Sequence, residues 1–197
     1  MTGIALLGAG RMGQVHAAAI VNAGARVAAV FDPMRAAAEA LASRTGARVA
    51  ATAAEAMADT SVDAIIVATS SDTHVDLVLE AAPLGKPVLC EKPLASTFEA
   101  TRRCIATIGE DAARRVFLGF NRRFDRGHAS VREAVHAGEI GRLEQLTITS
   151  RDPFPPPLEY VPRSGGLFRD MMIHDFDMAR SILRQEFVSV TAHGSAI

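Results

Sequence analysis

The chain has 197 residues, about half of them apolar, so it can bury a core and should form a globular protein of one domain or slightly more. Its formal net charge is −1, with acidic and basic residues interspersed, which argues against nucleic acid or an anionic membrane surface as a partner. No apolar run reaches the ~20 residues of a membrane-spanning helix, and the N-terminus lacks the pattern of a secretion signal.

The two cysteines, Cys90 and Cys104, have neither metal-type nor redox-type spacing, so we expect buried thiols and a reducing, cytoplasmic location. No set of His, Cys, Asp and Glu residues has metal-ligand spacing, and no metal is predicted. Arginine supplies nearly all of the positive charge, because Lys86 and Lys92 are the only lysines. A lysine can act as a compact donor with an adjustable pKa, which singles out Lys92, although an ordinary surface lysine is the alternative.

The first 118 residues alternate between short apolar runs and segments with helical periodicity. The predicted strands are Ile4–Leu7, Val27–Phe31, a weaker one near Val49, Ala64–Ala68, Val88–Cys90 and Val116–Leu118. The predicted helices are Met12–Ala23, Met34–Arg44, His74–Ala82 and Ser96–Ile108. Because alternating strands and helices indicate parallel pairing, residues 1–118 are predicted to form an α/β Rossmann domain with a doubly wound parallel sheet.

The pattern changes in residues 119–197, for which we predict an incomplete α+β second domain. A helix near Ser130–Ala137 and a half-exposed strand at Leu143–Ser150 precede a proline-rich loop. A helix from about Phe168 to Leu183 and a short strand at Phe187–Ala192 follow. Two strands are too few for a stable sheet and would leave apolar surface and pairing edges exposed.

Gly8, Gly10 and Gly13 form a G-x-G-x-x-G sequence between the first predicted strand and the first predicted helix. The first glycine permits a tight turn, the second lets the backbone approach a pyrophosphate, and the third lets helix and strand pack closely. The helix N-terminus then offers free N–H groups to the anion, and Arg11 and Met12 lie within this loop. The loop predicts a dinucleotide site, with a plain tight turn as the alternative.

Asp32 ends the second predicted strand, about 20 residues beyond the glycine loop. Its carboxylate can accept hydrogen bonds from the adenosine ribose and would repel the 2′-phosphate of NADP, so NAD is favoured over NADP. Arg35 is close enough to complicate this preference. Capping of the helix that begins near Met34 is an alternative or additional role for Asp32.

Five segments agree in order and spacing with one known family. They are Gly8–Gly13, Thr69–His74, Glu91–Pro93, Gly119–Asp125, and Gly165–Gly166 followed by Asp170, His174 and Asp175. On these segments the whole chain resembles the glucose-fructose oxidoreductase and inositol dehydrogenase family, often called Gfo/Idh/MocA. The last segment resembles its inositol 2-dehydrogenase branch in particular.

The resemblance implies NAD-dependent oxidation of a secondary alcohol of a cyclic polyol or sugar to a ketone. It implies a second domain built on a large, mostly antiparallel sheet that serves for oligomer contacts in the relatives and continues well beyond Ile197. The implied positions are Lys92, Asp170 and His174 in catalysis, Thr69, His74 and Glu91 along the cofactor, and Arg122 and Asp152 near substrate or nicotinamide.

The residues also support part of this reading without the family. Helical spacing puts Asp170, His174, Asp177 and Ser181 on one stripe and Met172, Phe176, Ala179 and Leu183 on the opposite, core-facing one. A solvated surface is the ordinary explanation, but an Asp one turn before a His can orient the imidazole as a base near neutral pH. Lys92 follows the carboxyl end of a parallel strand, where ligands bind, and could stabilise an alkoxide; a solvent-facing loop lysine is the alternative.

Two other functions stay open. The chain could sense a dinucleotide or sugar without turning it over, although intact Lys92, Asp170 and His174 argue against this. It could also be a catalytically incomplete NAD-binding relative of an enzyme, because its second domain is unfinished. His16, near the start of the first helix, is expected to be a packing or capping residue rather than a catalyst.

Overall fold

The computed structural model describes residues 1–159 and 161–195, apart from the side chain of Arg163. The chain divides into two compact units, Met1–Gly119 and Phe120–Ile197, and each is described by itself. The boundary expected between residues 118 and 119 lies one residue before this division. The end of the predicted second domain, residues 196 and 197, lies outside the described residues.

The first unit is built on one six-stranded sheet in which every pair of neighbouring strands is parallel. Its strands are β1 (Gly3–Leu7), β2 (Arg26–Phe31), β3 (Arg48–Val49), β4 (Ala64–Val67), β5 (Val88–Cys90) and β6 (Val116–Leu118). They lie in the order β3-β2-β1-β4-β5-β6, so the direction of winding reverses between β1 and β4. The predicted Rossmann sheet is confirmed, and ligands bind at such a reversal point, beyond the carboxyl ends of the strands.

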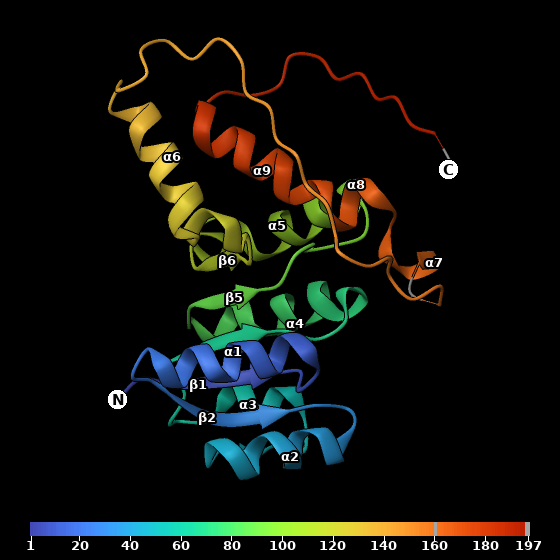
Figure 1. Cartoon of the computed structure of the whole chain (residues 1–197). Coiled ribbons are helices and arrows are strands. Elements are labelled where there is room, and N and C mark those ends of the chain that lie inside the picture. Colours follow the sequence, from blue (N-terminus) through green and yellow to red (C-terminus); the bar gives the residue numbers. More distant parts are fainter. Residues whose placement is uncertain (160, 196–197) are drawn as a thin grey trace. The chain divides into compact units, whose positions relative to one another are not determined.

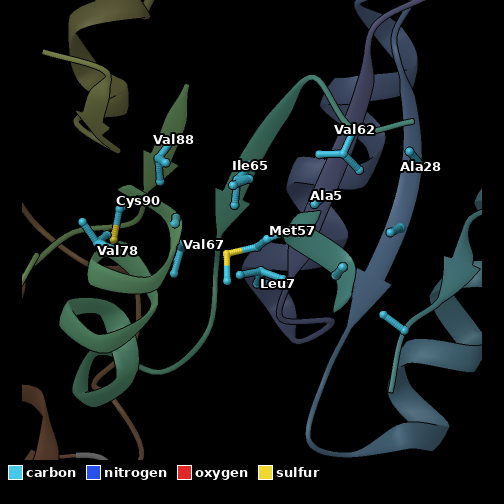
Figure 2. Close-up of a cluster of buried hydrophobic side chains, with 14 of the residues drawn as sticks. Ala5, Leu7, Ala28, Met57, Val62, Ile65, Val67, Val78, Val88 and Cys90 are labelled. Carbon is cyan, nitrogen blue, oxygen red and sulfur yellow. The ribbon is translucent and has the colours of Figure 1, made fainter. Parts of the chain in front are cut away.

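Helices cover both faces of this sheet (Figure 1). They are α1 (Arg11–Asn22), α2 (Arg35–Thr45), α3 (Ala53–Ala58), α4 (His74–Ala81) and α5 (Phe98–Ala113), with short 3-10 turns η1 (Ser71–Thr73) and η2 (Ala82–Leu84). Alternate residues of β1 point to opposite faces: Ile4 and Leu6 pack with α1 and α2, whereas Ala5 and Leu7 pack with α3, α4 and α5. Figure 2 shows the second of these two buried clusters.

The sequence prediction missed α3 and placed the end of α5 too early. Thr52 caps α3 by accepting a hydrogen bond from the Glu55 N–H at 3.1 Å, and Glu55 accepts one from the Ala51 N–H at 2.8 Å. This is close to a capping box, a signal that was present in the sequence. Helix α5 continues past residue 108 to Ala113 across a kink at Gly109, where φ is 75°.

Both cysteines are buried, as predicted. Burial raises the pKa of the Cys90 thiol to about 12, and the neighbouring Glu91 carboxylate adds to the effect. Because the folded-state pKa is raised, the stabilisation is present below the ordinary thiol pKa of 9.0 and is lost as pH rises toward 12.

We therefore expect the free energy of unfolding to fall between about pH 9 and pH 12, and thiol reagents to modify Cys90 and Cys104 only after unfolding. Thiol titration at pH 8 with and without urea checks this. Rapid modification of Cys90 in the native chain would contradict the burial argument, and Cys90→Ala should flatten the alkaline loss of stability.

The described part of the second unit contains helices and turns. They are η3 (Asn121–Phe124), α6 (Arg126–His136), α7 (Val161–Ser164), α8 (Leu167–Asp170) and α9 (Met172–Leu183). The strands predicted at Leu143–Ser150 and Phe187–Ala192 do not form, because an alternating pattern defines two faces of a strand but cannot supply its hydrogen-bonded partner.

The long helix predicted from Phe168 to Leu183 is broken at Met171, which separates α8 from α9. The predicted core face of this helix is wrong as well. Its buried residues are Asp177, Met178 and Ile182, whereas Phe176 and its stripe are only partly buried. The break resets the 100° stepping that started at Asp170, and an ion pair described below allows Asp177 to be buried.

Candidate functional site

The glycine loop joins β1 to α1 and has the geometry of an anion cradle. Gly8 has φ 99°, and a Cβ there would lie 2.4 Å from the Ala68 carbonyl oxygen. A Cβ on Gly13 would lie 2.0 Å from the Gly8 carbonyl oxygen, so helix and loop can approach this closely only with glycine. A Cβ on Gly10 would meet nothing within 4 Å, and no side chain caps α1 there. The N–H groups that begin at Arg11 and Met12 thus adjoin open space that fits a pyrophosphate.

Asp32 connects the end of β2 to this loop. One carboxylate oxygen accepts a hydrogen bond from the Ala9 N–H at 2.7 Å, and the other accepts one from the Met34 N–H at 2.8 Å. The carboxylate is thereby fixed beside the glycine loop, where a ribose can bind, and the capping alternative holds in part. Arg35 pairs with Glu39 at 2.8 Å on the exposed surface of α2, which occupies the cation expected to attract a 2′-phosphate.

Two more segments follow neighbouring strands at the same edge of the sheet. Thr69 follows β4, and its hydroxyl lies 2.7 Å from the Thr73 hydroxyl. His74, at the start of α4, is only 1% exposed, with Nδ1 2.8 Å from the Pro93 carbonyl oxygen and Nε2 3.2 Å from that of Thr69. His74 therefore acts on any bound dinucleotide through the main chain of these neighbours.

Glu91 follows β5 and carries a contact that the sequence did not indicate. Its carboxylate lies 2.7 Å from Nε2 of His16, which the sequence analysis treated as a packing or capping residue. Burial raises the pKa of Glu91, but the hydrogen bond and charge of His16 and the adjacent Lys92 outweigh burial and leave the pKa below its usual value. Lys92 comes next, in a segment outside helices and strands, and its peptide bond to Pro93 is cis.

The glycine loop, Thr69, Glu91 and Lys92 thus follow the carboxyl ends of β1, β4 and β5, which are adjacent in the sheet. This edge is where parallel α/β sheets bind ligands. The four cofactor positions implied by the motifs are brought to one edge of one unit.

The second unit holds a polar cluster around Arg122, in η3. Its guanidinium donates to the Asp175 carboxylate and, at 3.1 Å, to the Ser150 hydroxyl, and Ser150 donates to Asp175 at 2.6 Å. Asp152, the other residue expected near substrate, is exposed two residues beyond Ser150. The structure therefore brings the segment that precedes Asp152 to Arg122.

A second arginine, Arg123, makes a bidentate ion pair that the sequence analysis did not foresee. Its Nε and Nη2 donate to the two carboxylate oxygens of Asp177 at 2.7 and 2.5 Å. Asp177 is 6% exposed, so this pair gives a buried charge on α9 the partner it requires. The pairing holds η3 against α9, although 54 residues separate the partners in sequence.

We expect Asp177→Ala to lower the free energy of unfolding by about 1–3 kcal/mol, because Arg123 loses its partner but is partly exposed and can be rehydrated. The matched control is Glu186→Ala, which removes the bidentate partner of Arg180 at an exposed site and should change stability little. Urea denaturation of both variants measures the difference. Equal effects would show that burial of Asp177 does not matter.

The two residues expected to handle the proton lie at the α8–α9 break. Asp170 is the last residue of α8, and its N–H donates to the Gly166 carbonyl at 3.0 Å. His174 lies in the first turn of α9, with its ring edge-on to Phe120 at a centroid distance of 6.3 Å. An aromatic edge contact of this kind restricts the orientation of the imidazole.

Within residues 1–159 and 161–195, no group of three or more His, Cys, Asp and Glu side chains is arranged to hold a metal ion. Over the same part of the chain, every helix is too short or too polar to cross a membrane.

Comparison with known proteins gives two family matches. Residues 2–120 match the model described as an oxidoreductase family with an NAD-binding Rossmann fold, labelled GFO_IDH_MocA. Residues 128–197 match the model of the GFO/IDH/MocA C-terminal domain.

Curated and solved relatives give the same picture. The inositol 2-dehydrogenase of Rhizobium meliloti (strain 1021) is 50% identical over 193 residues, which are 98% of this chain and 58% of that protein. A crystal structure of a myo-inositol dehydrogenase from Corynebacterium glutamicum ATCC 13032 matches with TM-score 0.88 and 47% identity, over 92% of this chain and 55% of that one. A myo-inositol dehydrogenase from Lactobacillus casei, in complex with NAD(H) and myo-inositol, matches with TM-score 0.76 and 26% identity, over 93% and 55%. The chain thus spans little more than half the length of these relatives.

Proposed function

The chain belongs to the Gfo/Idh/MocA family of oxidoreductases, and we propose that it carries the NAD site and the catalytic residues of an inositol 2-dehydrogenase. The observation that carries the proposal is the cradle at Gly10 beside the fixed Asp32 carboxylate, in a chain half identical to an inositol 2-dehydrogenase. The reaction is oxidation of a secondary alcohol of a cyclic polyol to a ketone.

The first unit binds NAD. The N-terminal N–H groups of α1 hold the pyrophosphate, and Asp32 accepts the ribose hydroxyls. The Asp32 charge and the engagement of Arg35 by Glu39 favour NAD over NADP. NAD supplies the hydride acceptor of the reaction. Thr69 and Glu91 line the same edge of the sheet and complete the cofactor site.

The protein side chains handle the proton and the charge of the alcohol. His174 removes the hydroxyl proton, and Asp170 stabilises the imidazolium that results. The Lys92 ammonium stabilises the oxygen as it becomes negative during hydride loss. Arg122 and Asp152 bind the remaining hydroxyls, since a hydroxyl-rich substrate requires paired donors and acceptors. A reducing compartment, the cytoplasm, suits the two buried, unpaired thiols.

The test is to mix the chain with NAD and a panel of inositols and sugars and to follow NADH by absorbance, with NAD binding measured separately by calorimetry. We expect NAD to bind and NADH to form with at least one inositol. Binding of NAD without turnover of any inositol would refute the dehydrogenase proposal for this chain and leave an NAD-binding protein. Absence of NAD binding would refute both.

A further inference from the structure

The turn Glu91–Lys92–Pro93, here called the Lys92 turn, follows β5 and belongs to no helix or strand. Backbone hydrogen bonds of secondary structure therefore do not fix its shape. Its position depends on what contacts Glu91 on one side of Lys92 and Pro93 on the other. Both of these contacts come from histidines, and both histidines lie in the first unit.

The first contact comes from α1. His16 Nε2 lies 2.7 Å from Glu91 Oε1, and the two side chains are 16% and 13% exposed. The other carboxylate oxygen lies 3.3 Å from the Lys92 N–H, which donates to it. A Cβ on Gly119 would come within 3.0 Å of this carboxylate, so Glu91 occupies a space that only a glycine at position 119 leaves open. His16 and Gly119 together leave the Glu91 side chain one position.

The second contact comes from α4. The His74 ring is 1% exposed, and both of its nitrogens face main-chain carbonyl oxygens, those of Pro93 and Thr69. A neutral imidazole has a single N–H, so it can donate to one of these carbonyls only. The shorter separation, 2.8 Å, points to an Nδ1–H that donates to Pro93. The far side of the Lys92 turn is thereby anchored to the interior.

We infer that His16 and His74 are positioning residues for Lys92, and this inference rests on the proposed role of Lys92 in the reaction. They hold the residues on both sides of the lysine, one through a side chain and the other through a carbonyl. Helix α1 begins at the glycine loop, and α4 follows Thr69, so both histidines link the Lys92 turn to segments of the cofactor edge. Catalytic groups need such support, because small displacements are costly.

The chain offers a direct probe, because Lys86 and Lys92 are its only lysines. Lysine labelled with ¹³C at Cε gives two NMR signals, which Lys86→Arg assigns. Lys86 is an internal control, since its Nζ donates to the Met57 and Asp59 carbonyl oxygens at 2.7 and 3.0 Å, in contacts separate from the Lys92 turn. Its signal reports whether a variant keeps the native fold.

Asparagine and glutamine give a matched pair of variants with opposite expectations at the two sites. A glutamine amide approximates Nε2 of histidine, and an asparagine amide approximates Nδ1. His16→Gln should therefore keep the Glu91 contact and His16→Asn should lose it. At position 74 the order reverses, because His74→Asn keeps the Pro93 contact and His74→Gln does not.

We expect His16→Asn and His74→Gln to move the Lys92 signal and its pH titration while the Lys86 signal stays in place. His16→Gln and His74→Asn should leave both signals close to those of the native chain. The inference is overturned if the Lys92 signal is unchanged in all four variants, or if it follows the type of amide rather than the contact retained.

This readout requires neither NAD nor turnover, so it is independent of the proposed function. Where an inositol is oxidised, His16→Asn and His74→Gln should also lower kcat, by roughly ten- to a hundredfold, with a smaller change in the KM for NAD. A moved Lys92 signal in a chain that oxidises no inositol would refute the dehydrogenase proposal and leave the positioning of Lys92 standing. Turnover with an unmoved Lys92 signal would do the reverse.

Discussion

Gly10→Ala should weaken NAD binding strongly and leave the thermal unfolding midpoint unchanged. The Gly10 backbone, at φ −70°, accepts an alanine, and the added methyl group would meet nothing within 4 Å. That open space is where the pyrophosphate must approach the N-terminus of α1, so the methyl group and the ligand compete for it. An overpacking cost of about 1–3 kcal/mol corresponds to a loss of roughly ten- to a hundredfold in affinity. Calorimetric titration with NAD measures the loss.

Gly13→Ala provides the matched contrast. A Cβ there would lie 2.0 Å from the Gly8 carbonyl oxygen, which belongs to the backbone and has no flexible end that could move aside. This variant should lower the unfolding midpoint as well as NAD affinity, whereas Gly10→Ala should lower affinity alone. If Gly10→Ala binds NAD as well as the native chain does, the pyrophosphate does not lie against this loop.

Lys92→Ala and His174→Ala should each reduce inositol oxidation by roughly two to four orders of magnitude, the usual contribution of a positioned acid or base. NAD affinity should change much less, because the dinucleotide is held by the glycine loop and Asp32. Initial rates of NADH formation at saturating NAD and inositol measure the effect. The expected loss is in kcat, since both groups act when charge develops on the alcohol oxygen.

Lys86→Ala is the control for the lysine variant. It removes the other lysine of the chain and two hydrogen bonds to main-chain carbonyls, so we expect lower stability with turnover retained below the unfolding transition. Equal losses of turnover in Lys86→Ala and Lys92→Ala would mean that Lys92 acts through the fold. Full turnover in His174→Ala would remove this histidine from the proton transfer.

Much of the first unit could be predicted from sequence because its signals are local. Each apolar run that was predicted as a strand became one, from β1 to β6, since a parallel strand buried on both faces must be apolar throughout. The glycine loop followed from the same logic, because its turn, cradle and helix start are adjacent in the chain. Asp32 was found by its distance from that loop. The missed helix α3 had a capping signal of its own at Thr52 and Glu55.

The contacts that support the site were not predictable in the same way. His16 and Glu91 are 75 residues apart, and His74 and Pro93 are 19 apart, so neither pair has a periodicity or spacing that identifies it. Arg123 and Asp177 are separated by 54 residues and appear in sequence as one more surface arginine and one more polar stripe. Only the packing of distant elements gave these side chains their partners.

The second unit shows the same limit for secondary structure. Its helices satisfy their backbone hydrogen bonds internally, so α6 and α9 were predictable from a continuous segment, except for the break at Met171. A strand needs a partner from elsewhere, and the alternating segments at residues 143–150 and 187–192 had none to identify. The sequence by itself determined the Rossmann sheet, the glycine loop and the preference for NAD, because local sterics and charge set them. The tertiary structure decided which side of α9 is buried and what holds Lys92, because those depend on contacts between residues far apart in the chain.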